Sequence, residues 1–224
     1  MRSLQKQSIL FFLVLAFANS LIAQNGNHST FYYQRVSLFE NLPTSNEDII
    51  FLGNSITNGG EWAELLNDKR IKNRGISGDV CTGVLDRLHS IVAGEPAKIF
   101  LLIGINDLGR GSMPDSVVHK TGEIIERIQK ESPNTSIYIQ SILPVNESFG
   151  MFKGHTQHKD IIKPLNNKLK CLANKKGVEF IDLYSHFVTP GTSNLDPLYT
   201  NDGLHLMGEG YIKWTEILKP YIYD

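Results

Sequence analysis

A serine, a histidine and an aspartate stand at separate points of this chain, and together they could supply a nucleophile, its base and an orienting carboxylate. Ser55 lies in Gly53-Asn54-Ser55, and His205 closes the segment Asp202-Gly203-Leu204-His205. A serine hydroxyl becomes a useful nucleophile only when a neighbouring base takes its proton. Across one turn, Asp202 can reach the imidazole and stabilise its charged form. We therefore predict Ser55, Asp202 and His205 as the catalytic residues of an acyl transfer.

Hydrogen-bond donors for such a reaction are also present. Attack on an ester carbonyl places negative charge on oxygen, and each donor aimed at that oxygen is worth about 3 kcal/mol. We predict three donors, the backbone N–H groups of Ser55 and Gly78 and the side-chain amide of Asn106 in Gly104-Ile105-Asn106-Asp107. Gly78 suits this role because a residue without Cβ permits close approach and unusual dihedral angles. Together these residues indicate acyl-ester hydrolysis.

Each candidate also has an ordinary structural interpretation. Ser55 suits the N-cap of a helix, Gly78 an ordinary turn, and Asn106 a hydrogen bond within its own loop. Asp202 fits an Asx-turn before a helix, and His205 fits a satisfied surface histidine. For Asp202 the two roles are compatible, since the turn itself would hold the carboxylate beneath the imidazole ring.

Short apolar runs alternate with helical patterns from residue 48 onward, which predicts a parallel sheet covered by helices on both faces. The last helix is predicted over Gly208 to Leu218, directly after the histidine. Ligands of open parallel sheets bind outside the carboxyl ends of the strands, and the candidate residues all follow that rule. The predicted strands are Asp48 to Leu52, Ile71 to Arg74, Ile99 to Ile103, Ser136 to Ser141 and Val178 to Asp182.

The first 23 residues have the pattern of a secretory signal peptide. Arg2 and Lys6 precede an unbroken apolar run, Ile9 to Ala18, which is too short to cross a bilayer. Small and then polar residues follow, and we predict cleavage after Ala23. The mature chain is then expected to be exported to the periplasm or secreted, without stable insertion in a membrane.

Residues 24–224 are predicted to form one domain, because no low-complexity linker or internal repeat divides them. The chain has 22 basic and 23 acidic residues, and loss of the signal peptide removes two bases, which leaves a net charge of −3. This balance argues against nucleic acid as a partner. No GxGxxG, P-loop or G-x-S-x-G pattern occurs, so no cofactor is expected.

Two pairs of residues could carry other chemistry. Cys81 and Cys171 are the only cysteines. A disulfide between them stays open, but two buried free thiols are favoured because free cysteine usually behaves as a small apolar residue. His155 and His158 are spaced for one helix face, yet no third ligand follows, so a solvated loop is favoured over a metal site.

Aromatic residues raise the question of carbohydrate stacking. The stretch Phe31 to Phe39 predicts an amphipathic helix packed on the domain, although its aromatic rings could instead form a sugar-binding surface. Trp62 could stack on a sugar ring or pack in the core. The loop Pro144 to His158 could form one wall of the site.

The chain resembles the SGNH hydrolases, also called GDSL-type esterases and lipases. The likeness covers nearly all of the mature chain. Asn54 stands where the family usually has Asp, which is not the acid of the family's triad. The matching blocks are Phe51 to Thr57, Asn73 to Asp79, Gly104 to Asp107 and Asp202 to His205.

By this resemblance the four named family residues fall on Ser55, Gly78, Asn106 and His205, with Asp202 as the third member of the triad. The family implies a flavodoxin-like three-layer α/β/α fold with no metal. The block around Ser55 is most similar to the acetylhydrolase branch, which implies hydrolysis of short acyl esters. Export favours an acetylated carbohydrate. The alternatives are a lysophospholipase or thioesterase using the same site, and a non-catalytic glycan-binding protein with this fold.

Overall fold

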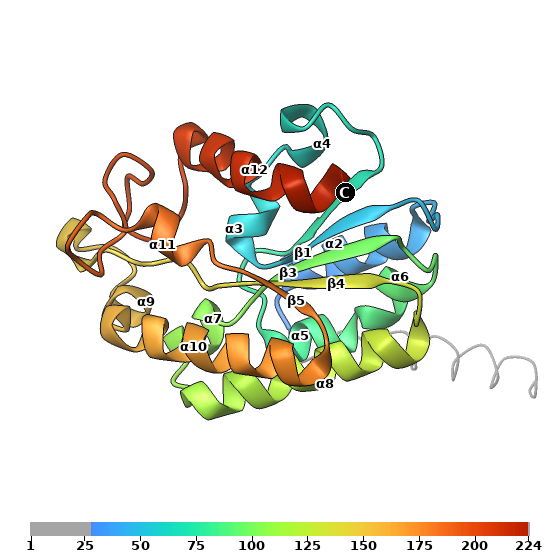
Figure 1. Cartoon of the computed structure of the whole chain (residues 1–224), viewed down its shortest axis with the longest axis horizontal. Coiled ribbons are helices and arrows are strands. Elements are labelled where there is room, and N and C mark those ends of the chain that lie inside the picture. Colours follow the sequence, from blue (N-terminus) through green and yellow to red (C-terminus); the bar gives the residue numbers. More distant parts are fainter. Residues whose placement is uncertain (1–27, 224) are drawn as a thin grey trace, which may run out of the picture.

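The structure is a computed structural model that describes residues 28–223. At its centre lies a sheet of five parallel strands (Figure 1). The strand order is that of flavodoxin-like doubly wound sheets, so the predicted three-layer α/β fold is confirmed. Each predicted strand is present, with ends shifted by no more than one residue. Across the sheet the order is β2 (Ile71–Gly75), β1 (Ile49–Gly53), β3 (Lys98–Leu102), β4 (Ser136–Gln140) and β5 (Glu179–Ile181).

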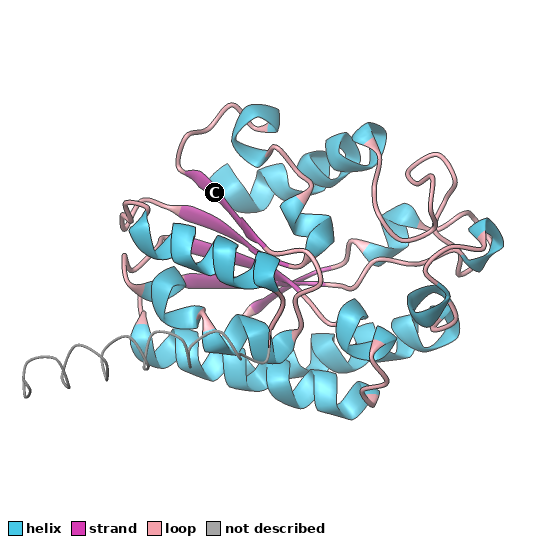
Figure 2. Cartoon of the chain, turned by 180° about the vertical axis from the view of Figure 1, so that it is seen from behind, coloured by secondary structure: helices cyan, strands magenta, loops and turns pink. Residues whose placement is uncertain are grey.

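Helices cover both faces of the sheet, as views from opposite sides show (Figures 1 and 2). One face carries α5 (Cys81–Asp86), α6 (Leu88–Val92), α8 (Pro114–Glu131) and α10 (Lys159–Lys176), with α2 (Thr30–Asn41) packed beside α6. The other face carries α3 (Ser55–Asn58), α4 (Trp62–Leu65) and α12 (Gly208–Tyr223). Shorter helices lie in the loops at the carboxyl edge: α7 (Ile105–Gly109), η1 (Glu147–Phe149), α9 (Lys153–Thr156) and α11 (Tyr184–Phe187).

An aromatic column crosses the sheet. Phe51, Phe100 and Tyr138 occupy paired positions on β1, β3 and β4, and their rings stack with centroids 5.2 and 4.5 Å apart. Trp62 stacks on Phe51 at 4.6 Å and meets Trp214 of α12 edge-on at 4.7 Å. Only 1% of Trp62 is exposed. Trp62 is therefore a core residue, and the hypothesis that it stacks on a sugar is wrong.

The amphipathic stretch after β2 is interrupted at Arg87, where α5 ends and α6 begins. The side chain of Arg87 is fully buried. Cys81, the first residue of α5, is a buried free thiol as predicted, and burial raises its pKa well above the usual value. Cys171 is also free but exposed on α10, so the prediction that both thiols are buried is wrong. It sits on the solvent side of a helix whose apolar stripe faces the sheet.

Helix α2 places Tyr32 and Phe39 in the interior, while Phe31 and Tyr33 keep 39% of their surface exposed. The predicted signal peptide lies outside the described residues. Within residues 28–223, no helix is long and apolar enough to cross a membrane. The division into a signal peptide and one domain stays a prediction.

We expect Trp62→Ala to destabilise the fold by about 3–5 kcal/mol, because it removes a large buried ring and the hydrogen bond from Trp62 Nε1 to the Thr57 carbonyl, 2.8 Å long. Urea unfolding measures this loss. Met113→Ala is the control, since Met113 is 72% exposed and its truncation should cost about 0.5 kcal/mol or less. Equal stabilities of the two variants would contradict the assignment of Trp62 to the core.

Candidate active site

The predicted site residues lie in segments at the carboxyl edge of the sheet, where α3 and α7 begin (Figure 1). Ser55 begins α3 directly after β1, Gly78 lies in the turn after β2, and Asn106 lies in α7 after β3. Asp202 and His205 lie in the loop that leads into α12. Strands β1, β2 and β3 thus each place one residue just beyond their carboxyl ends, the region in which doubly wound folds bind ligands.

A chain of hydrogen bonds joins three of these residues. Ser55 Oγ lies 3.0 Å from His205 Nε2, although the two residues are 150 positions apart. On the other side of the ring, His205 Nδ1 lies 2.8 Å from Asp202 Oδ2. An ionised carboxylate only accepts, so Nδ1 carries the proton and Nε2 offers a lone pair to the serine hydroxyl. This arrangement can remove a proton from Ser55.

Asp202 is held by its own turn. Its Oδ1 accepts the backbone N–H groups of Leu204 and His205 at 2.8 and 2.7 Å, while Oδ2 faces the imidazole. The Asx-turn and the contact with His205 therefore coexist. Burial alone would raise the pKa of Asp202, but these hydrogen bonds and the nearby imidazole outweigh it and lower the pKa below its usual value.

The helix that follows His205 is tied to the helix that begins with Ser55. The Tyr211 hydroxyl of α12 donates to the Ile56 carbonyl of α3 at 2.9 Å. Burial raises the pKa of Tyr211 to about 12, so the phenol keeps the proton that this hydrogen bond needs. This contact helps to hold the imidazole against the serine.

Asn54 shapes the turn that presents Ser55. Its Oδ1 accepts the Ile56 N–H at 3.0 Å and so caps α3. Asn54 is fully buried, and its Nδ2 has no partner among the described residues. The side-chain oxygen of Asn54 thus caps α3, as an oxygen of an aspartate at this position could also do. As the first residue of α3, Ser55 has a backbone N–H that the helix itself cannot satisfy.

Gly78 and Asn106 lie in segments that hydrogen bonds join. The backbone turns between Ile76 and Asp79, where Gly78 has φ +80°, a conformation that favours glycine. Arg110 donates to the Gly78 carbonyl at 2.6 Å. Asn106 Nδ2 donates to the Asp79 carbonyl at 2.8 Å. Asn106 therefore joins its helix to the neighbouring loop, and does not simply stitch its own loop together.

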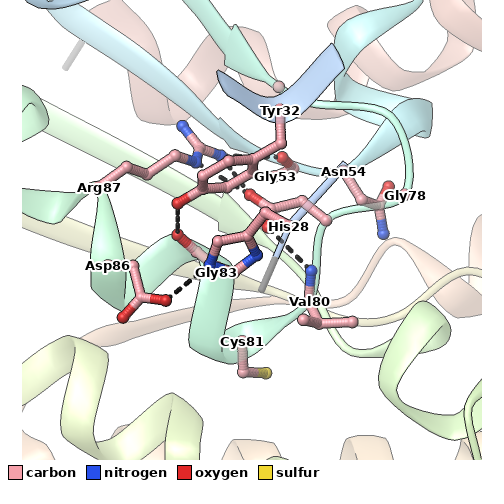
Figure 3. A network of polar contacts seen from close by, with 12 residues as sticks. His28, Tyr32, Gly53, Asn54, Gly78, Val80, Cys81, Gly83, Asp86 and Arg87 are labelled. Atoms are coloured by element: carbon pink, nitrogen blue, oxygen red, sulfur yellow. Dashed lines mark hydrogen bonds and ion pairs between the residues drawn. The ribbon is translucent and has the colours of Figure 1, made fainter. Parts of the chain in front are cut away.

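A buried ion pair lies beneath these segments, and Figure 3 shows its arginine, Arg87, between Gly53 and the loop after β2. Arg87 Nη2 lies 2.8 Å from Asp79 Oδ2, and neither side chain is more than 1% exposed. Arg87 also donates to the Gly53 carbonyl at 3.2 Å, and Asp79 Oδ1 accepts the Val80 N–H at 3.0 Å. Burial raises the pKa of Asp79, and the adjacent guanidinium opposes that rise. The pair connects the end of β1 to the loop after β2.

The loop between β4 and α10 contributes two residues that were not assigned to the site from the sequence. His155 was predicted to lie in a solvated loop, but it is only partly exposed and its Nε2 lies 3.0 Å from Asn106 Oδ1. The ring of Phe152 meets His205 edge-on at 5.0 Å. The loop was predicted as one wall of the site, but the sequence carried no signal for these two contacts.

Among residues 28–223, no group of three or more His, Cys, Asp and Glu side chains could hold a metal ion. The Nε2 atom of His155 is hydrogen-bonded to the side-chain oxygen of Asn106, and is therefore not directed at a site shared with His158.

Comparison with known proteins identifies the family. Residues 51–212 match the model of the GDSL-like lipase/acylhydrolase family, and the matched region includes four whole strands, the end of β1 and every candidate residue. The chain belongs to this family. It is therefore a carboxylic ester hydrolase, and the alternative of a non-catalytic glycan-binding protein is set aside. The resemblance to SGNH hydrolases is confirmed.

Individual relatives share the fold over most of their length. A Streptococcus pneumonia protein provisionally described as a platelet activating factor is 28% identical, with a TM-score of 0.78 over 95% of this chain and 99% of that chain. A GDSL-like lipase from Bacteroides thetaiotaomicron is 24% identical, with a TM-score of 0.73 over 85% of this chain and 96% of that one. An acetyl-xylooligosaccharide esterase from Geobacillus is 17% identical, with a TM-score of 0.63 over 81% and 96%.

One curated relative is longer. The N-acylneuraminate cytidylyltransferase of Escherichia coli is 25% identical over 193 residues, which are 80% of this chain and 43% of that protein. The chain thus spans less than half the length of this relative.

In this GDSL-like hydrolase, we expect Arg87→Met to destabilise the fold by about 3–5 kcal/mol, because it leaves the Asp79 carboxylate buried without a counter-ion. Urea unfolding measures the loss. Adding Asp79→Asn should recover part of it, since the uncompensated charge is then gone. The control is Arg70→Met, which breaks only a surface pair with Asp68 and should cost less than about 1 kcal/mol.

The lowered pKa of Asp202 predicts a pH-dependent contribution to stability. A carboxyl group whose pKa is lower in the folded state stabilises the fold above its unfolded value, near pH 4, and loses this effect as the pH falls through the folded value. The free energy of unfolding of the parent should therefore exceed that of Asp202→Asn at pH 7, and the difference should shrink below pH 4. A difference that does not change with pH would contradict this assignment.

Proposed function

We propose that this chain is an exported serine esterase that removes acetyl groups from carbohydrate through an acyl-enzyme on Ser55. The observation that carries the proposal is the hydrogen-bonded chain from Ser55 Oγ to His205 and on to Asp202, with distances of 3.0 and 2.8 Å. It pairs a nucleophile with a base, and the base with an orienting carboxylate, which is the requirement for serine-based acyl transfer.

In the first half of the reaction, His205 Nε2 takes the hydroxyl proton of Ser55 as Oγ attacks the carbonyl carbon of the ester. The carbonyl oxygen becomes an oxyanion, which the N–H groups of Ser55 and Gly78 and the amide of Asn106 stabilise. The imidazolium then gives its proton to the departing alcohol. The C–O bond of the ester breaks and the acyl group stays on Ser55.

In the second half, water replaces the alcohol. His205 removes a proton from the water, whose oxygen attacks the acyl carbon and forms a second oxyanion in the same position. Collapse of this intermediate returns the proton to Ser55 Oγ and releases the carboxylic acid. Asp202 stays ionised throughout and stabilises the imidazolium in both halves of the reaction.

Three observations support a carbohydrate ester as the substrate. The E. coli relative acts, by its name, on N-acylneuraminate, which is a sugar acid. The same fold serves an esterase of acetylated xylooligosaccharides. The N-terminal pattern of Arg2, Lys6 and the apolar run that follows supports export, which would bring the enzyme to extracellular glycans.

A second candidate is a lysophospholipase or thioesterase that uses the same residues. Met151 and Phe152 are 49% and 41% exposed, and the ring of Phe152 lies beside His205. Exposed apolar side chains at this place would suit an acyl chain longer than acetyl.

The test compares hydrolysis by the purified chain of O-acetylated xylooligosaccharides and O-acetylated N-acylneuraminate with its hydrolysis of acetylated phospholipid, long-chain phospholipid and acyl thioesters, measured as release of the carboxylic acid. We expect turnover of the acetylated sugars and little hydrolysis of long-chain lipid esters. Rapid hydrolysis of lipid esters with untouched sugars would support the second candidate.

Ser55→Ala should abolish turnover of every ester, because within residues 28–223 the Ser55 hydroxyl is the one hydrogen-bonded to the base. A fluorophosphonate should label the parent and not this variant, since only an activated serine reacts. Ser77→Ala serves as the control, because its hydroxyl is bound to Asn58. Undiminished turnover by folded Ser55→Ala would show that the nucleophile is another residue.

A further inference from the structure

The amide of Asn106 can have only one orientation. The Asp79 carbonyl accepts and cannot donate, so the group 2.8 Å from it must be Nδ2. An amide nitrogen carries two hydrogens, and one of them remains for an oxyanion. The opposite atom of the amide is therefore Oδ1, which needs a donor because Asn106 is buried.

His155 supplies that donor. Its Nε2 lies 3.0 Å from Asn106 Oδ1, and since Oδ1 only accepts, Nε2 must carry a hydrogen. Burial lowers the pKa of His155, and the positive charges of His205, His158 and Arg110 would lower it further. At neutral pH the ring is then neutral, with its proton on Nε2. A neutral ring also places no second charge beside the imidazolium that forms on His205.

The loop holds His155 closely. The ring lies against Gly109, where a Cβ atom would come within 2.6 Å of the imidazole, so a larger residue there would have to displace the ring. Directly before α9, Phe152 has φ +50°, a conformation unusual for a residue with a bulky side chain. The Thr156 hydroxyl donates to the carbonyls of Met151 and Phe152. A strained backbone conformation such as that of Phe152 persists only where the surrounding contacts impose it.

We propose that His155 is a positioning residue that orients and polarises the Asn106 amide as a donor to the oxyanion. The inference rests on the proposed function, since it gives His155 a role only if Asn106 faces the reacting oxygen. A donor on Oδ1 withdraws electron density from the amide and strengthens the hydrogen bond that Nδ2 makes. The effect grows as charge develops on the oxyanion, so it lowers the barrier more than it aids substrate binding.

The experiment compares kcat and KM on p-nitrophenyl acetate. We expect His155→Phe to lower kcat about tenfold with KM nearly unchanged, less than the roughly hundredfold loss expected for Asn106→Ala. His155→Gln, whose amide nitrogen can reach the place of Nε2, should recover most of the lost kcat. His158→Phe is the control on the same loop and should match the parent.

A double variant separates positioning from general damage. In an Asn106→Ala background, His155→Phe should cause no further loss of kcat, because His155 acts only through Asn106. Equal losses in both backgrounds, or no recovery by His155→Gln in a folded protein, would overturn the proposal. If Asn106→Ala keeps full kcat, the oxyanion role itself fails. If Asn106→Ala is impaired and His155→Phe is fully active, only the role of His155 fails.

Discussion

The buried ion pair between Asp79 and Arg87 is the interaction on which the geometry of the carboxyl edge depends. Two charges taken out of water are stable only when each finds further polar partners. Arg87 donates to the Gly53 carbonyl (Figure 3), and Asp79 accepts the N–H of Val80. Gly53 leads directly into the turn that carries the serine, and the Asp79 carbonyl fixes the amide of Asn106. One pair thus sets the spacing between the ends of β1, β2 and β3.

The sheet could be predicted from the sequence because its signals are local. Strands buried on both faces are unbroken apolar runs, and Ile49–Gly53 and Lys98–Leu102 lie within one residue of their expected positions. The topological rule for ligand sites then places Ser55 and Asn106 on one edge. At that edge the fold brings Ser55 Oγ to 3.0 Å from His205 Nε2, and Asn106 Nδ2 to 2.8 Å from the Asp79 carbonyl.

The features that escaped prediction depend on contacts between distant segments. Arg87 follows apolar residues in a helical pattern, and nothing nearby in the sequence says that a charge there is buried against Asp79. His155 meets Asn106 across 49 residues of chain through a loop whose path no periodicity describes. Cys171 was predicted to be buried because a free cysteine usually packs as a small apolar residue. It is exposed because it lies on the side of α10 that faces away from the sheet.

The two tryptophans give the chain an internal optical reporter. Trp62 and Trp214 are the only indoles in the sequence, and they meet edge-on at the junction between the aromatic column and α12. Because α12 begins close behind His205, a shift of this helix away from the sheet would separate the indoles and move the end of the segment that carries the imidazole. Intrinsic fluorescence therefore reports the seating of α12 against the aromatic column, without a label and without a substrate.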